Sequence, residues 1–201
     1  MAWSDVGNTD SDNKVNFVKF TAGSPVTMRI VDEDLITRWV HWDNVKKRSF
    51  TCLGEGCPAC EINKQMTEAG VEKSKLRFGN SKKHTTHIIN RDTNQLELLE
   101  QSDGFFKNIS TLIDNGYGDP TGYDIKVIRM GTGKDTKYSL IPSPPTPMGD
   151  ADKALMDNKQ DLADRLKAMS IEGCRELIGI DTPVQGTGNG GGLAVDFNAQ
   201  G

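Results

Sequence analysis

The stretch Ser49–Glu61 reads S-F-T-C-L-G-E-G-C-P-A-C-E and places three cysteines within nine residues. Zinc binds deprotonated thiolate and imidazole ligands in a tetrahedron, and pairs of these ligands usually come from tight turns. The turn Cys57–Cys60 supplies one such pair, and the glycines that follow Cys52 let the chain bring a third thiolate to the same ion. The stretch therefore predicts a loop that is held by one metal ion.

Four side chains are candidates for the fourth ligand, namely His41, His84, His87 and Cys174. We favour His41, which lies near the end of an expected strand and leaves ten residues for the chain to return to Cys52. The other two histidines fall in a basic strand, which is typical of surface or groove positions, and Cys174 falls among helical apolar positions, which is typical of a buried thiol. A Cys₃His set fills all four positions with protein ligands, so the zinc would be structural rather than catalytic.

The turn C-P-A-C, followed by an expected helix, also resembles a thiol-disulfide redox motif, in which the helix N-terminus lowers the pKa of the first thiol. That motif normally follows a strand in a βαβ unit, and it leaves Cys52 without a role. Zinc binding is the favoured interpretation. An oxidoreductase that uses Cys57 and Cys60 stays open as an alternative, as does a zinc-ribbon module that contacts proteins or acts in transcription.

The composition, with 35% hydrophobic and 26% charged residues in a chain of 201, is that of a polar globular protein with one substantial domain and appendages. No positively charged start followed by an apolar run marks a secretory signal, and no stretch reaches the roughly 18 apolar residues of a membrane helix. We therefore expect a soluble protein inside the cell, without membrane association. Thiols stay reduced there, so clustered cysteines indicate a metal or redox chemistry.

Apolar periodicity predicts a mixture of strands and helices. Alternation predicts strands over residues 25–32, 35–43, 82–92, 95–100, 123–130 and 136–142. Helical spacing bounded by proline or glycine predicts helices over residues 58–70, 103–116 and within 150–178. Turn sequences join the third strand to the fourth and the fifth to the sixth, which predicts two hairpins. Short antiparallel strands with few helices favour a mainly β, α+β fold built on an OB-type barrel.

This pattern divides the chain into parts. We expect a flexible acidic start over residues 1–14 and a core over residues 15–145, with a zinc subdomain at about residues 39–70. A proline-rich linker then leads into a helical appendage over residues 146–180. The composition of residues 181–201 predicts a flexible glycine-rich tail.

The net charge of −4 is unevenly distributed, because residues 38–84 carry ten Lys and Arg against five Asp and Glu. Trp39, Trp42 and Phe50 lie among these bases. Cations that follow phosphates, together with flat rings that stack on unpaired bases at about 1–3 kcal/mol each, are typical of single-stranded nucleic acid binding. The alternative is that Trp39 and Phe50 are core residues and that the lysines form a solvated surface.

Several motifs together resemble the zinc-containing single-stranded DNA-binding proteins of tailed phages, of which the gene 32 protein of the T-even phages is the best-known relative. These motifs are His41–Trp42, the loop T-C-L-G-E-G-C-P-A-C (51–60), F-F-K-N-I-S-T-L (105–112) and G-Y-D-I-K-V-I-R-M-G-T-G-K-D-T-K-Y (122–138). The resemblance covers about residues 15–145. It implies an OB-fold body with a zinc subdomain, and its pattern of one His followed by three Cys carries over to His41, Cys52, Cys57 and Cys60.

The resemblance also implies a non-enzymatic protein that coats and protects single-stranded DNA during phage DNA replication, recombination and repair, in the cytoplasm of the bacterial host. Phage replication or recombination proteins would be partners, and copies could associate on the DNA. Two departures bear on this. The chain begins with Asp5, Asp10 and Asp12, where the T-even protein has a basic arm for cooperative self-association, and its last twenty residues are mostly glycine and neutral rather than acidic.

Candidate DNA contacts are basic and aromatic side chains of the matched region. They are Arg38, Trp42, Lys46, Lys47, Arg48, Phe78, Lys82, Lys83, Arg129 and Tyr138. No Ser-His-Asp set, phosphate-binding loop or paired carboxylate cluster stands out, so we predict no catalytic residues.

Overall fold

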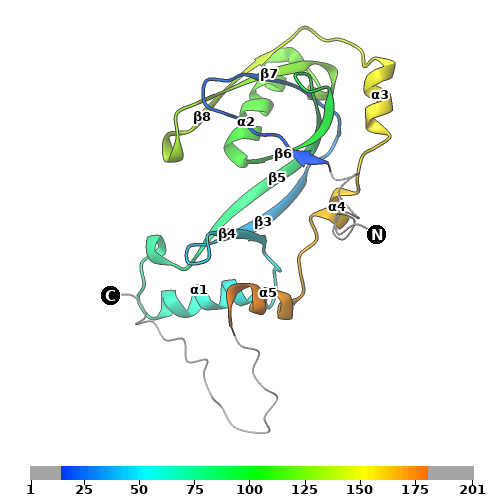
Figure 1. Cartoon of the computed structure of the whole chain (residues 1–201). Helices are drawn as coiled ribbons and strands as arrows, with labels where there is room; N and C mark the ends of the chain where they lie inside the picture. Colours follow the sequence, from blue (N-terminus) through cyan, green and yellow to red (C-terminus); the bar gives the residue numbers. More distant parts are fainter. Residues whose placement is uncertain (1–14, 181–201) are drawn as a thin grey trace, which may run out of the picture.

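An eight-stranded mixed sheet is the main element of the protein (Figure 1). The structure is a computed structural model that describes residues 15–180, so the expected flexible segments 1–14 and 181–201 lie outside the described residues. Its strands are β1 (Asn16–Phe17), β2 (Val26–Ile30), β3 (Ile36–Asp43), β4 (Arg48–Thr51), β5 (Phe78–Asn90), β6 (Gln95–Ser102), β7 (Asp124–Met130) and β8 (Lys137–Pro142). Its helices are α1 (Pro58–Glu68), α2 (Asp103–Leu112), α3 (Asp150–Met156), α4 (Leu162–Arg165) and α5 (Ile171–Ile178). The mixed α+β class is confirmed.

The strand order is β1-β6-β5-β2-β7-β8, and β3 pairs with both β5 and β4. Both predicted hairpins are confirmed: β5 pairs antiparallel with β6, and β7 pairs antiparallel with β8. Only β1 pairs in parallel, with β6, among the described strands. The short strand β4 was not predicted, because Phe50 is the one large apolar residue in its four positions. Its pairing depends on β3, a contact that local periodicity does not show.

The expected closed OB barrel is not formed, and the paired strands make an open path from β1 to β8 within residues 15–180. A single bridge between Ala22 and Arg129, with a hydrogen bond from Gly23 N to Arg129 O of 3.1 Å, joins the segment after β1 to β7. Gly23 has a φ of 80° and is followed two residues later by Pro25, which has no N–H to donate. The contact between this segment and β7 therefore ends after one bridge.

Helix α2 packs on the sheet and supplies much of the core of the body. Phe105, Phe106 and Ile109 are spaced so that one face of α2 meets the sheet, as the helical pattern predicts. They pack against buried side chains of β2, β5, β6 and β7, together with Phe20 and Tyr123. The sheet residues are Met28, Ile30, Ile88, Leu99, Ile125 and Val127.

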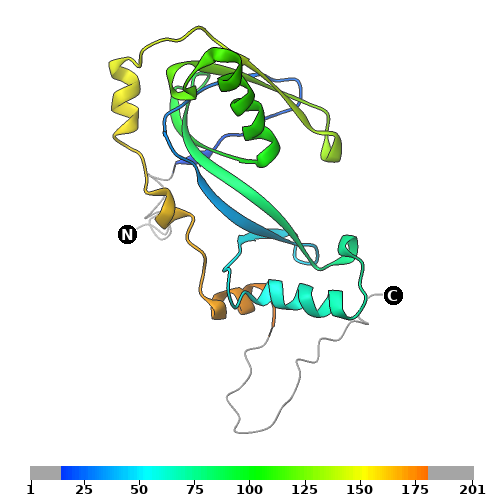
Figure 2. The ribbon, with the colours of Figure 1, turned by 180° about the vertical axis from the view of Figure 1, so that it is seen from behind.

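The first half of β5 extends beyond the body together with β3 (Figures 1 and 2). The β3–β5 ladder runs without interruption from Ile36 opposite Thr85 to Asp43 opposite Phe78, and β4 adds a third strand. We call the three strands β3, β4 and residues 78–85 of β5 the arm. Helix α1 lies at its far end. The ladder therefore continues the sheet of the body to the end of the arm.

The last three helices connect the body to the end of the arm. Arg91 in the β5–β6 turn pairs with Asp152 of α3, with Nη2 3.0 Å from Oδ2, and also with Asp124 of β7. Helix α5 then packs Cys174 and Ile178 into the apolar cluster around α1. Helices within the expected segment 150–178 are confirmed. Within the described part of the chain, no helix has the length and apolar character needed to cross a membrane.

Candidate metal centre and nucleic-acid surface

Four ligand atoms converge at the end of the arm, from His41 on β3, Cys52 after β4, Cys57 before α1 and Cys60 in its first turn. All four atoms lie within 4.8 Å of one another. The Sγ atoms of Cys52 and Cys60 are 3.6 Å apart, and His41 Nε2 lies 3.5 Å from Cys57 Sγ and 3.4 Å from Cys60 Sγ. Zinc bonds of about 2.0–2.3 Å put neighbouring tetrahedral ligands about 3.4–3.8 Å apart. The cluster therefore fits one zinc-like ion.

Local backbone geometry builds this cluster. The amide of Cys52 donates to Trp39 O at 2.8 Å, which fixes the start of the loop on the edge of β3. Gly54 and Gly56 then adopt φ values of 80° and 69°, a region that glycine enters without steric cost. Pro58 begins α1 directly after Cys57, where a missing N–H is tolerated. The loop thereby returns Cys57 and Cys60 to the strand that carries His41.

The electrostatics of the four groups favour a cation. Burial lowers the pKa of His41, so its imidazole is neutral and can bind a metal. Burial, the hydrogen bond with Cys52 and the neighbouring thiolates raise the pKa of Cys60 to about 12. Burial also opposes ionisation of Cys57, but backbone hydrogen bonds outweigh it and its pKa is lowered. A divalent ion at the centre of the four groups would favour the thiolate form of Cys60.

The other fourth-ligand candidates lie outside the cluster. His84 contacts Thr37 Oγ1 at 2.7 Å and the carboxylate of Asp103, and His87 contacts Asp32 at 2.8 Å. Cys174 is buried beside Cys57 in the same apolar cluster but is not one of the four converging groups, and burial raises its pKa to about 11. All three cysteines of the loop are free thiols. The Cys52–Cys60 separation is far longer than the roughly 2.05 Å of a disulfide.

Aromatic side chains surround the ligand from β3. The His41 ring, 1% exposed, lies 5.4 Å from the Phe50 ring and 6.3 Å from the Phe78 ring. Phe78 is also 1% exposed, because the β3–β5 register places it opposite Asp43 on the side that α1 covers. It cannot stack on a DNA base in this position. The prediction of Phe78 as a DNA contact is therefore corrected, and its place is in the core around the metal cluster.

Three other candidate contacts are held by interactions with neighbouring elements: Arg38 on β3, Arg129 on β7 and Tyr138 on β8. Arg38 pairs with Glu100 and donates to Thr85 Oγ1 at 2.9 Å. Arg129 donates to Phe20 O at 2.9 Å, and Tyr138 packs edge-on against Phe20 and Phe105 in the body core. Arg129 and Tyr138 therefore lie apart from the arm, whereas Arg38 lies opposite Lys83 in the β3–β5 ladder and is paired with Glu100. Lys46 is exposed but donates to Leu177 O at 2.8 Å, which joins it to α5.

The remaining candidates lie on the arm with their side chains at least partly open to solvent. Trp42 is 45% exposed, Lys47 and Arg48 are exposed, and Lys82 and Lys83 are half-buried. Trp42 faces the opposite side of the sheet from His41, as strand alternation predicts, with Ser49 and Gly79 beside it in the ladder.

Trp39 is a surface residue, whereas the sequence left open whether it belongs to the core. It is 52% exposed and lies directly opposite Lys82 in the β3–β5 ladder. Alternation puts it on the same side as His41 and His84. The metal cluster with α1 covers His41, and Phe106 of α2 lies 5.3 Å from the His84 ring, so that Trp39 stands between two covered patches. Position within the strand could not reveal this gap, because helices distant in sequence create it.

Comparison with known proteins gives no further assignment: the chain matches no protein-family model, and no curated protein matches it.

Proposed function

We propose that this protein binds single-stranded DNA without catalysing a reaction, through the arm, and that one structural zinc ion holds the end of the arm in place. The observation that carries the proposal is the two half-exposed tryptophans of β3, Trp39 and Trp42, which face opposite sides of a strand that pairs with β5 and β4. Aromatic rings that stay exposed on a paired strand are available to stack on unpaired bases.

Basic side chains accompany both tryptophans. Lys82 lies opposite Trp39 on one side of the sheet. Lys83 follows Lys82 in β5, and its side chain faces the other side. Lys47 and Arg48 lie at the turn into β4, close in sequence to Trp42. Unpaired bases stack on aromatic rings while cations follow the phosphates, so this combination suits a single strand with little sequence preference. We call the six residues Trp39, Trp42, Lys47, Arg48, Lys82 and Lys83 the arm surface, which includes both sides of the sheet: Trp39 and Lys82 face one side, and Trp42 and Lys83 face the other.

The proposed zinc would act structurally. His41, Cys52, Cys57 and Cys60 supply four protein ligands, and a tetrahedral set of four leaves no open position for a reacting water. The ion would join β3, the loop after β4 and α1. The same geometry favours metal binding over the oxidoreductase alternative, because a dithiol motif does not explain the convergence of Cys52 and His41 on Cys57 and Cys60.

The relationship to the zinc-containing single-stranded DNA-binding proteins of tailed phages is part of this proposal. It is supported by the one-His, three-Cys cluster and by the bridge from Ala22 to Arg129, which gives the open sheet a trace of OB-type closure. It extends the proposal to phage DNA replication, recombination and repair in the cytoplasm of a bacterial host, with partners among the phage replication or recombination proteins and with self-association on DNA.

A fluorescence titration tests the function. We expect poly-dT to quench the tryptophan fluorescence and to bind more weakly as salt is added, because binding releases counterions. Poly-U in parallel shows whether the protein distinguishes DNA from RNA. A preference for duplex DNA over poly-dT, or no binding to either single strand, would overturn the proposal. Zinc quantitation with a disulfide-reductase assay separates it from the redox alternative.

A further inference from the structure

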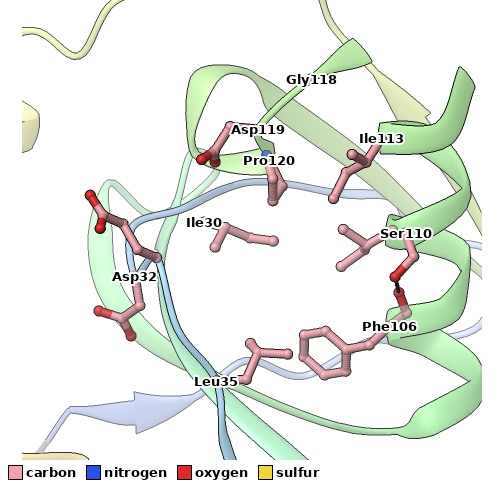
Figure 3. A pocket seen from close by; sticks show the side chains of 11 residues that line it. Ile30, Asp32, Leu35, Phe106, Ser110, Ile113, Gly118, Asp119 and Pro120 are labelled. Atoms are coloured by element: carbon pink, nitrogen blue, oxygen red, sulfur yellow. Dashed lines mark hydrogen bonds between the residues drawn. The ribbon is translucent and has the colours of Figure 1, made fainter. Parts of the chain in front are cut away.

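A second candidate site lies on the body, away from the arm. It is a cleft of about 500 Å³ between α2 on one side and the connection from β2 to β3 on the other, with residues 118–120 at its upper edge (Figure 3). Pockets that bind partners or ligands commonly fall within about 300–1,000 Å³. The cleft takes no part in the metal centre or the arm surface.

The floor of the cleft is apolar. Ile30, Phe106 and Ile109 close its base and are 3%, 8% and 4% exposed. Leu35 and Ile113 stand at its sides and are 40% and 43% exposed, so two large apolar side chains face solvent next to a preformed apolar base (Figure 3). Such exposed apolar surface is typical of a site that a partner covers.

The edge of the cleft is acidic. Asp32, Glu33 and Asp119 line it, and none of its lining residues is Lys, Arg or His. Lys159 pairs with Asp32 at 2.5 Å, but no ion pair within residues 15–180 neutralises Glu33 or Asp119, which are both exposed. Hydrogen bonds from the amide and hydroxyl of Thr121 lower the pKa of Asp119, which keeps its carboxylate charged. This charge repels phosphates and attracts cationic groups.

We propose that this cleft is a docking site for a cationic segment of a partner protein, which inserts one large apolar side chain between α2 and the β2–β3 connection and places Lys or Arg beside Glu33 and Asp119. The two ends of this chain have the wrong charge for that role. Residues 1–14 carry three Asp and one Lys, and residues 181–201 carry two Asp and neither Lys nor Arg. An apolar anchor surrounded by complementary charges is the usual arrangement of a small interface.

The experiment uses the full-length protein and three fluorescent nine-residue peptides on a Gly-Ser background. The first has a central Leu flanked by Lys and Arg, the second has the same Leu flanked by Glu, and the third has the cationic flanks around a central Ser. Fluorescence anisotropy measures the affinity. We expect the first peptide to bind at least about tenfold more tightly than either of the others. Equal affinity of the first and third peptides would overturn the proposal, because charge alone, without the apolar side chain, would then account for the binding.

Two variants locate the binding. Ser110 lines the cleft, is exposed, and its hydroxyl bonds to its own helix at Phe106 O, so Ser110→Trp fills the cleft without removing a contact to another element. Glu33→Lys reverses one charge at the edge. We expect each to weaken the first peptide about tenfold. Glu68→Lys, on the exposed end of α1, changes the net charge equally and should have no effect. Weaker peptide binding by Glu68→Lys, or unchanged peptide binding by Ser110→Trp, would contradict the proposal.

Two measurements distinguish other occupants. If a second copy fills the cleft, the free protein will dimerise in sedimentation equilibrium and Ser110→Trp will abolish the dimer. If residues 181–201 of the same chain fill the cleft through Phe197, Phe197→Ser will free the cleft and increase the affinity for the first peptide. Either result would overturn a partner protein as the occupant. Peptide binding is measured without DNA and can be scored even if DNA binding fails, so the two proposals stand or fall separately.

Discussion

The carboxylate of Asp43 is fully buried and accepts a hydrogen bond from Arg77 Nη2 at 3.1 Å. Its Oδ1 also accepts the amides of Val45 at 2.9 Å and Lys46 at 3.2 Å, which shapes the turn after β3. The same Arg77 donates to Ile178 O at the end of α5. One buried ion pair thus joins β3, the start of β5 and the last helix beside the metal cluster.

Asp43→Asn should destabilise the protein by about 2–3 kcal/mol near pH 7, because Arg77 loses its charged partner in a mostly buried position. Burial opposes ionisation of Asp43, but the Arg77 and backbone hydrogen bonds outweigh it and lower its pKa. A lowered folded-state pKa gives stability that is complete above the ordinary carboxyl pKa of about 4 and is lost as the pH falls through the folded-state value. Urea unfolding of both proteins from pH 7 to pH 3 measures this difference.

The difference between the wild type and Asp43→Asn should therefore shrink in acid. Asp114→Asn, at an exposed position, is the matched control and should change stability little at any pH. A constant difference between wild type and Asp43→Asn down to pH 3 would show that the carboxylate charge is not what stabilises this junction.

The metal centre predicts that two cysteines of the same apolar cluster differ in their effect on zinc binding. Cys57→Ser removes a proposed ligand, so we expect the zinc content to fall from one ion per chain to none. Hydrogen exchange should then become faster in α1 and β4, while the ladders of the body keep their protection. Cys174→Ser changes a buried thiol outside the ligand set and should retain one zinc. Zinc loss in Cys174→Ser, or retention in Cys57→Ser, would contradict the assignment.

The aromatic residues of the arm predict two kinds of variant. Trp39→Ala and Trp42→Ala should each weaken poly-dT binding by about 1–3 kcal/mol and leave the unfolding midpoint nearly unchanged, because both rings are half-exposed. Phe78→Ala should instead destabilise the fold by about 3–5 kcal/mol, since it leaves a cavity beside His41. Tyr117→Ala, an exposed aromatic outside the arm, controls for surface effects. Full affinity in both tryptophan variants would remove the arm from the proposed interface.

The metal ligands could be predicted from the sequence because three of them lie within nine residues and the fourth lies on a strand with clear alternation. The start of β5 could not be predicted from the sequence. Gly79, Asn80 and Ser81 have low strand propensity, and only pairing with β3 makes them a strand. The burial of Phe78 depends on this same pairing, which a general expectation of aromatic DNA contacts does not reveal. The sequence also could not show that the sheet stays open, because closure depends on the pairing of residues as distant in sequence as Ala22 and Arg129.

The lysines of the arm predict the salt dependence of binding. For single strands, the slope of log K against log salt concentration falls by about 0.7 for each phosphate contact that is lost. Lys82→Gln and Lys83→Gln should each reduce the slope by about this amount, and the double variant by about twice as much if both lysines contact phosphates. Lys82 also lies 3.8 Å from Asp103, a long and half-exposed pair whose loss should cost little stability. Lys64→Gln, on the exposed side of α1 with Glu68 at 3.9 Å, is the control and should keep the full slope. Titrations of oligo-dT at several salt concentrations give each slope, and an unchanged slope in the double variant would show that the strand does not pass over this part of the arm.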